Sequence, residues 1–167
     1  RFSGYLTYAN QSGIGHGPIT GGLFLGSDAQ AQVANPTRFA VSQDQRNTAR
    51  FRVRFQVTPR AWLSGGAQYG SGLPADVGDT SESTLVAQYG AAVVNQVNFQ
   101  RSRVHPNFLL DAAAGAELYH KEHHQASIQV QGTNLTNRLN VINFESVFSG
   151  TAIAPPRSAS AQFQFTF

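Results

Sequence analysis

The sequence predicts an all-β protein, an antiparallel up-and-down segment of transmembrane β-barrel wall with about six strands. Three observations predict this fold. Six segments alternate apolar and polar residues, long and short connections alternate between them, and charged residues make up only 13% of the chain. Soluble domains are typically about 25% charged. No run of 18 apolar residues is present that could form a membrane helix, so the low charge points to strands.

Composition excludes several classes of protein. Twelve Phe and 16 Gly, with no Met, favour strands and turns over long helices. The absence of Cys excludes disulfides, thiolate metal sites and thiol nucleophiles. The net charge of +3 is too small an excess to indicate a nucleic-acid partner.

The clearest strand is expected over residues 48–57. Apolar residues occupy every second position there, and Arg50, Arg52 and Arg54 lie between them. A short connection containing a proline follows, and a second strand over 61–69 completes a hairpin with a tight turn. One face of this hairpin is therefore apolar, and the other carries three guanidinium groups.

Four further segments show the same alternation. The last strand, for example, sets Ala159, Ala161, Phe163 and Phe165 against serine, glutamine and threonine. A polar turn over residues 119–124 is expected between the fourth and fifth of the six strands. The expected strands are 107–118, 125–133 and 157–167, with a weaker one at 2–9.

The connections are the second argument for a membrane barrel. The long ones, about residues 10–47, 70–106 and 134–156, are loops by composition, rich in Gly, Ser, Asn and Gln. In an up-and-down sheet all three leave one edge, and both short turns leave the other. Outer-membrane barrels have this asymmetry, and strands of about 9 to 11 residues match a bilayer crossing. No charged residue falls on an apolar face, so the three arginines would face the lumen.

Short motifs near the end of the chain resemble a known family. Asn134-Leu135-Thr136-Asn137 follows the penultimate strand, and Pro155-Pro156-Arg157 opens the last. The final strand carries apolar residues at every second position and ends on an aromatic one, through Phe163, Phe165 and Phe167. These features resemble the C-terminal end of TonB-dependent outer-membrane receptors, especially the Oar-like group.

The resemblance implies a fold and a function. Residues 1–167 would be the C-terminal part of a 22-stranded barrel domain in the bacterial outer membrane, without the plug domain and the TonB box. The receptor would take up a scarce ligand. Its partners would be outer-membrane lipid, the barrel assembly machinery that reads Phe163, Phe165 and Phe167, the TonB system acting through the plug, and an extracellular ligand whose identity stays open.

Other candidate sites have simpler interpretations. His120, His123 and His124 are close enough in sequence to hold Zn or Cu, but a solvated periplasmic turn is the simpler interpretation. The glycine-rich segment 13–17 lacks the following helix that a phosphate loop needs. Asn134 begins a formal glycosylation sequon, but a turn at the strand end is the simpler interpretation. No metal, cofactor or catalytic residue is predicted, and no enzyme is expected.

Two alternatives to a transport protein stay open. The first is a soluble or surface-displayed all-β binding module that uses its long loops for recognition. The second is an outer-membrane enzyme, which would need a Ser-His or carboxylate cluster near the loop edge. The sequence contains no pattern that predicts such a cluster.

Overall fold

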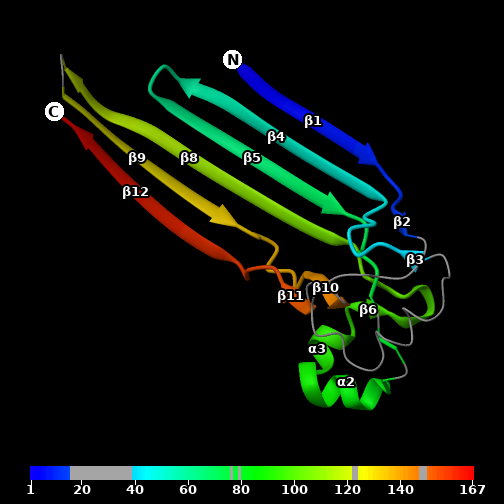
Figure 1. The fold of residues 1–167 in the computed structure, drawn as a ribbon. Helices are drawn as coiled ribbons and strands as arrows, with labels where there is room; N and C mark the ends of the chain where they lie inside the picture. The colour runs from blue at the N-terminus through cyan, green and yellow to red at the C-terminus, as the bar shows by residue number, and fades with distance from the viewer. Residues whose placement is uncertain (16–38, 76, 79, 122–123, 147–149) are drawn as a thin grey trace.

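Six long strands form one antiparallel sheet in a computed structural model that describes residues 1–15, 39–75, 77–78, 80–121, 124–146 and 150–167. Their order across the sheet follows their order along the chain, β1-β4-β5-β8-β9-β12 (Figure 1). The up-and-down antiparallel topology is therefore confirmed. The strands are β1 (Phe2–Asn10), β4 (Asn47–Thr58), β5 (Ala61–Gly70), β8 (Asn107–Lys121), β9 (His124–Thr133) and β12 (Ser158–Thr166).

The strand boundaries agree closely with the predicted ones, with one correction. The predicted turn over residues 119–124 is wrong, because β8 continues to Lys121 and pairs there with His124. A register shift between Glu117 and Tyr119 adds one residue to β8 without ending the ladder. The bulge keeps the polar end of the strand in the sheet.

The three long connections contain more regular structure than their composition indicates. The prediction that they are loops throughout is wrong, since the middle one contains two helices and a small hairpin. We call the described residues of the connections 11–46, 71–106 and 134–157 the loop cap. Its elements are β2 (Ile14–Gly15), β3 (Phe39–Ala40), α2 (Glu82–Tyr89), α3 (Ala91–Val94), β6 (Val97–Asn98), a 3₁₀ turn (Phe99–Arg101), β7 (Arg103–Val104), β10 (Val141–Ser146) and β11 (Gly150–Ile153).

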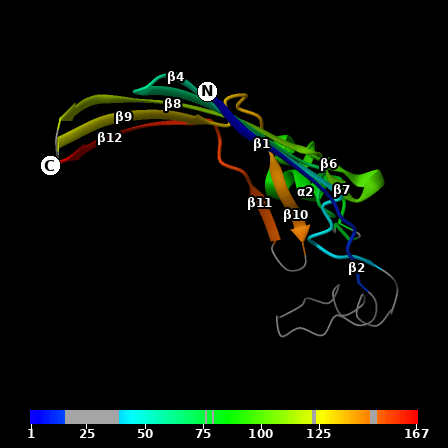
Figure 2. The ribbon, with the colours of Figure 1, turned by 90° about the horizontal axis from the view of Figure 1, so that it is seen from above.

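All the cap elements gather at one end of the sheet, and both short turns lie at the other end (Figure 1). In the view from above, the sheet is curved, and β10 and β11 project from its concave side (Figure 2). None of the helices in the described ranges is long and apolar enough to span a membrane.

The register places the alternating apolar residues of the six strands on one face of the sheet, whereas Trp62 and Leu109 lie on the other. Phe51 pairs with Ala67, which pairs with Leu110, and Val130 pairs with Ala161. This apolar face is uncovered: the exposed fraction is 71% for Leu6 and 63% for Phe163 on the two edge strands. Large exposed apolar patches mark a surface that meets another apolar phase or partner.

The buried core lies in the loop cap instead of the sheet. Leu85 of α2, Val94 of α3 and Phe144 of β10 have exposed fractions of 1% or less. Tyr89 packs edge-on against Phe144, with ring centroids 5.1 Å apart. The complete cluster of buried residues is Ala75, Leu85, Val94, Val97, Val104, Val141 and Phe144.

Candidate functional site

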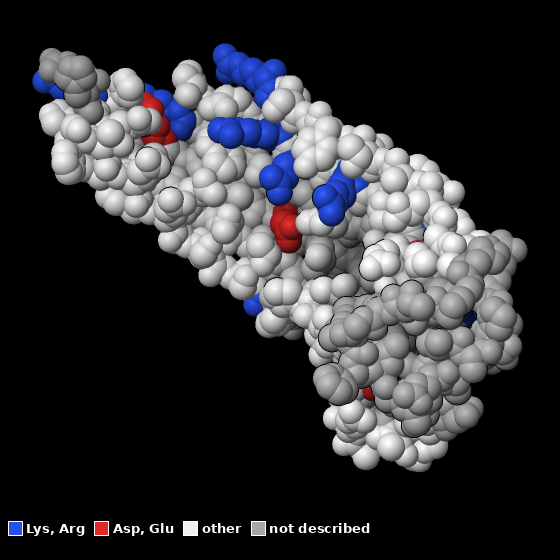
Figure 3. Space-filling view, in the orientation of Figure 1, with Lys and Arg blue, Asp and Glu red and all other residues white. Residues whose placement is uncertain are grey.

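The concave face of the sheet carries a row of cations. Arg50, Arg52 and Arg54 occupy alternate positions of β4, so their side chains share this face and are exposed. Lysine and arginine side chains are spread over the same face in the space-filling view (Figure 3). Among the described residues, none of these three guanidinium groups has a carboxylate within 4.0 Å. The row therefore presents unneutralised positive charge.

Arg54 is held against the single tryptophan of the chain. Its guanidinium carbon lies 4.2 Å from the centroid of the Trp62 ring, within the range of a cation–π contact. Trp62 pairs across the sheet with Gly115, and its ring lies over that glycine. A Cβ on Gly115 would come within 2.6 Å of the ring atoms Cε2 and Cζ2. The missing side chain thus allows the indole to lie flat beneath Arg54.

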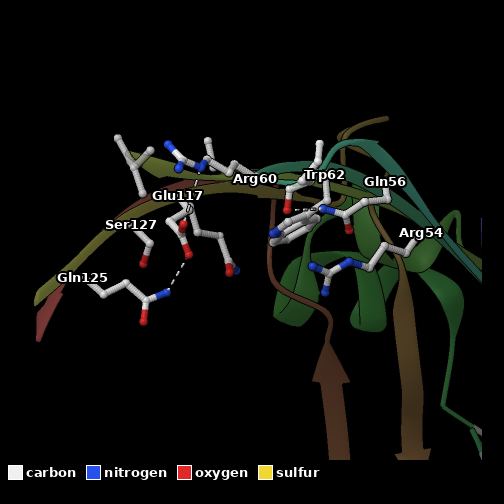
Figure 4. A pocket seen from close by; sticks show the side chains of 11 residues that line it. Arg54, Gln56, Arg60, Trp62, Glu117, Gln125 and Ser127 are labelled. Atoms are coloured by element: carbon white, nitrogen blue, oxygen red, sulfur yellow. Dashed lines mark hydrogen bonds and ion pairs between the residues drawn. The ribbon is translucent and has the colours of Figure 1, made fainter. Parts of the chain in front are cut away.

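A hollow of about 270 Å³ lies next to this stack, toward the end of the sheet with the short turns. Arg54 and Trp62 form one side of the hollow, and Glu117, Gln125 and Ser127 form the other (Figure 4). The lining comes from four neighbouring strands, because β4, β5, β8 and β9 are consecutive in the sheet.

Glu117 is the acidic group of this hollow, and its charge is already partnered. One of its carboxylate oxygens accepts a hydrogen bond of 3.0 Å from Gln125 Nε2 and lies 3.5 Å from Nδ1 of His120. The other oxygen lies 3.8 Å from Nε of Arg60, whose side chain is 64% exposed. The Arg60 contact is long and exposed, so its contribution to stability is small.

A second polar cluster joins two of the long connections at the base of the loop cap. The fully buried Asp44 carboxylate accepts hydrogen bonds from the Gly13 N–H, at 2.9 Å, from Arg46 and from Arg103. Arg103 also donates to the backbone oxygens of Asp44 and Gly72, at 2.8 and 2.9 Å. Burial raises the pKa of Asp44, but the hydrogen bonds from Gly13, Arg103 and Arg46 outweigh it and lower the pKa below its ordinary value.

Asparagine side chains fasten the third connection to the sheet. The buried Asn140 pairs with Phe108 of β8 like a backbone strand, donating to its carbonyl and accepting from its N–H, both at 3.0 Å. Asn134 donates through Nδ2 to the carbonyls of Arg138 and Pro155, at 3.0 and 3.1 Å. Its backbone φ of 47° lies in the left-handed region that asparagine tolerates well. The Asn134 motif is a structural turn at the end of β9.

Within the loop cap, the Tyr89 hydroxyl of α2 donates a short hydrogen bond to the Glu145 carboxylate of β10. This bond, together with burial, raises the pKa of Tyr89. Glu145 also has a positive φ of 48°, and its N–H donates to the Thr151 hydroxyl at 3.1 Å. The contacts tie helix α2 to the β10–β11 hairpin.

The proposed assembly-signal aromatics lie at the end of the chain: Phe163 and Phe165 are on the edge strand β12, and Phe167 directly follows it. Phe163 pairs with Ile128 and Phe165 with Ala126, so both are on the apolar face. The rings of Phe165 and Phe167 have centroids 5.6 Å apart, and Phe167 is 84% exposed. The structure thus brings these three side chains onto one exposed apolar edge.

The other candidates form no common site in the described part of the chain. His120 lies beside Glu117 on β8, His124 begins β9, and His123 lies outside the described residues. No group of three metal-binding side chains is found among the residues that the structure describes. In the glycine-rich segment, Gly13 and Gly15 lie near or in β2, and residues 16–17 are outside the described ranges.

Sequence reasoning missed the stack of Arg54 on Trp62 and the Asp44 cluster. The stack depends on the register of β4 against β5, which period-two patterns alone do not give. The Asp44 cluster joins residues 59 positions apart. A tryptophan on the polar face, beside an arginine on the neighbouring strand, was the one available signal.

The arrangement as a whole presents cations on the concave face and apolar side chains on the convex one. Comparisons of the chain with protein-family models, with curated proteins and with solved structures found no match.

Proposed function

We propose that this chain is wall of an outer-membrane β-barrel, in a TonB-dependent receptor that takes up a scarce ligand across the bacterial outer membrane. The apolar convex face meets lipid, the concave face with the arginine row lines the lumen, and the loop cap lies outside the cell. The one observation that carries the proposal is the uncovered apolar face shared by all six strands.

A soluble sheet of this kind would cover its apolar face with a second layer. Here the helices and hairpins pack on one another at the end of the sheet, and Phe51, Leu63 and Val130 stay 46%, 51% and 47% exposed. Burying these side chains in lipid would remove their apolar surface from water and stabilise the sheet, which the fold of the chain alone does not do. The distribution of exposed surface therefore supports a membrane location.

The sheet edges support the same proposal. Every residue of β1 and β12 is exposed, and within the described part of the chain each of these strands pairs with one neighbour only. An unpaired edge cannot persist within hydrocarbon, because its backbone groups have no water to bind. In a receptor of this kind, further strands on both sides would close the barrel. The same strands would hold the plug against the arginine row.

The loop cap favours a second candidate function, that of a surface-displayed binding module. Its buried core, around Leu85 and Phe144, makes it a firm surface of the kind used for recognition. A surface-displayed binding module would use this cap and would keep the sheet in water. The two functions differ in what surrounds the sheet, so an experiment on the sheet separates them.

The test places one new arginine on each face of β9. Val130 lies on the apolar face, and its neighbour Gln131 lies on the opposite face. In phospholipid vesicles, Val130→Arg should lower the free energy of unfolding by about 2 to 4 kcal/mol, the cost of arginine at the lipid face. Gln131→Arg should lower it by less than about 1 kcal/mol, since its face is polar.

The measurement is denaturant unfolding in vesicles of the protein that contains this chain, followed by tryptophan fluorescence. Equal effects of the two substitutions would contradict a lipid-facing surface. Cooperative folding of the unmodified protein in plain buffer would contradict it as well, and would favour the binding module.

A further inference from the structure

We propose that the hollow between Arg54 and Glu117 is a binding site for a small oxyanion, a carboxylate or a phosphate, which the Arg54 guanidinium receives in a fixed orientation. The site lies on the concave face, at the end of the sheet opposite the loop cap. It requires only the sheet, so it does not depend on the proposed transport function.

The first argument is the orientation of Arg54. A free arginine side chain loses much conformational freedom when it binds a ligand, and this loss weakens binding. Here the Trp62 ring holds the guanidinium at 4.2 Å, and the ring itself is held flat over Gly115. The planar fork of donors matches the two oxygens of a carboxylate or phosphate. Part of the ordering cost is therefore met before the ligand arrives.

The second argument is the balance of charge around the hollow. Its lining contains two guanidinium groups, of Arg54 and Arg60, and one carboxylate, of Glu117. The carboxylate already accepts a hydrogen bond from Gln125 and lies 3.5 Å from Nδ1 of His120. Arg54 has no carboxylate within 4.0 Å among the described residues. An incoming anion gains a new charge-assisted hydrogen bond, whereas an incoming cation would compete for an occupied acid.

The third argument concerns the remaining donors. Arg60 contributes only a long, exposed contact to Glu117, so its guanidinium can turn toward a ligand at little cost. Ser127 and Gln129 of β9 also line the hollow, and each has a side-chain group that can donate a hydrogen bond. A volume of about 270 Å³ is slightly below the usual size of drug-sized ligand sites. The ligand is therefore expected to be smaller than a typical drug-sized molecule.

The location of the tryptophan provides a direct experiment. Trp62 is the only tryptophan of the chain, so its fluorescence reports on this hollow alone. The full chain is titrated with succinate and, separately, with inorganic phosphate, in whichever medium gives a cooperatively folded β signal by circular dichroism, plain buffer or non-ionic detergent micelles. Sodium chloride at the same ionic strength is the reference. We expect a saturable fluorescence change with at least one oxyanion, matched by heat in isothermal calorimetry, and none with chloride.

Two matched variants locate the binding. Arg54→Gln removes the oriented cation, and the affinity should fall roughly tenfold or more, as expected for loss of a charge-assisted hydrogen bond. Arg50→Gln makes the same change on the same strand and face but outside the hollow, and the affinity should stay within about twofold. Arg54→Lys keeps the charge but removes the planar pair of donors, so its carboxylate affinity should lie between the affinities of Arg50→Gln and Arg54→Gln.

The outcomes decide between specific binding and general attraction. A fluorescence change with succinate but not with phosphate would assign a carboxylate site, and a change with phosphate but not with succinate would assign a phosphate site. A response to chloride equal to that of both oxyanions, or an equal loss in the Arg50 and Arg54 variants, would overturn the proposal. Should Arg54→Gln alter the far-ultraviolet circular dichroism, the Arg54→Lys comparison carries the test. Absence of any saturable response in the unmodified chain would also overturn it.

Discussion

Asp44 joins two connections that are far apart in sequence, through bonds to Gly13 and Arg103. Its side chain is fully buried, so the hydrogen bonds replace its lost hydration. Residues that bind in this way contribute stability mainly because their loss leaves a partner unpaired. The cluster is therefore expected to control how firmly the loop cap is attached to the sheet.

The substitution Asp44→Asn should lower the free energy of unfolding of the loop cap by about 2 to 3 kcal/mol, because it leaves Arg103 partly buried without its counter-ion. The measurement is hydrogen exchange by mass spectrometry, followed over residues 71–75 and 101–105. The control is Glu82→Gln at the exposed start of α2, with an expected effect below about 0.5 kcal/mol. Unchanged exchange in the Asp44 variant would contradict the proposed role.

The lowered pKa of Asp44 gives this contribution a defined pH dependence. A carboxylate with a folded-state pKa below its unfolded value stabilises the fold at pH values above the unfolded value, here 3.8. The stabilisation is lost as the pH falls through the lower, folded pKa. The stability difference between the unmodified protein and Asp44→Asn should therefore be constant above about pH 5 and should shrink below pH 3.8. Denaturant unfolding at a series of pH values measures this difference, and a difference that instead shrank between pH 5 and 8 would point to another group.

The contact between Trp62 and Gly115 can be tested by adding one methyl group. Gly115→Ala would place a Cβ within 2.6 Å of the indole ring, so the ring must move and release Arg54. We expect a loss of about 1 to 3 kcal/mol in stability and a red shift of Trp62 fluorescence. Gly66→Ala is the matched control, because its Cβ would meet no atom closer than 3.5 Å. A red shift of the same size in both variants would show that the contact does not hold the ring.

At the scale of single elements, the six strands could be predicted because apolar residues recur at every second position, most regularly in β4, β9 and β12. The alternation is weaker in β1 and β5, and the tryptophan of β5 lies on the polar face. The helix α2 could not be predicted, because Leu85 is its only fully buried residue and the helix is eight residues long. Leu85 belongs to the same core cluster as Val141 and Phe144, more than fifty positions later in the chain. Such contacts leave no periodic pattern.

The candidate site, like the strands and helices, could be predicted from the sequence only in part. The side of the sheet that carries Arg50, Arg52 and Arg54 could be predicted from alternation alone. The hollow could not, because Glu117 and Trp62 come together only through the register of β5 on β8 and the bulge after Glu117. Alternation along one strand predicts which face a residue occupies. Which residues meet across neighbouring strands depends on the register of the pairing, which alternation does not give.

The loop cap should depend on its own core. Phe144→Ala removes a fully buried ring that contacts Tyr89, at an expected cost of about 3 to 5 kcal/mol. Hydrogen exchange should rise across α2 and α3 and stay unchanged in β8 and β9, because the sheet shares none of these contacts. Ile142→Ala is the control on the same strand, since Ile142 is 40% exposed. Equal acceleration in cap and sheet would show that the two unfold as one unit.

At the scale of the whole molecule, the sheet has one uncovered apolar face and two unpaired edges. Both features promote association in water. We expect residues 1–167 to sediment as aggregates in detergent-free buffer and to show a stronger β signal by circular dichroism in micelles. The control is the same chain with Val130→Gln and Phe163→Gln, which should be less aggregated in buffer. A monodisperse, cooperatively folding chain in plain buffer would contradict the expectation.

The separate core of the loop cap also bears on how the molecule would respond to heat. The cap gains its stability by removing Leu85 and Phe144 from water, so it should melt with the heat-capacity change of a small water-soluble fold. The sheet buries little surface within the chain, and its melting would follow the phase around it. A calorimetric scan should therefore resolve two transitions. Only the transition of the sheet should move when the detergent is exchanged.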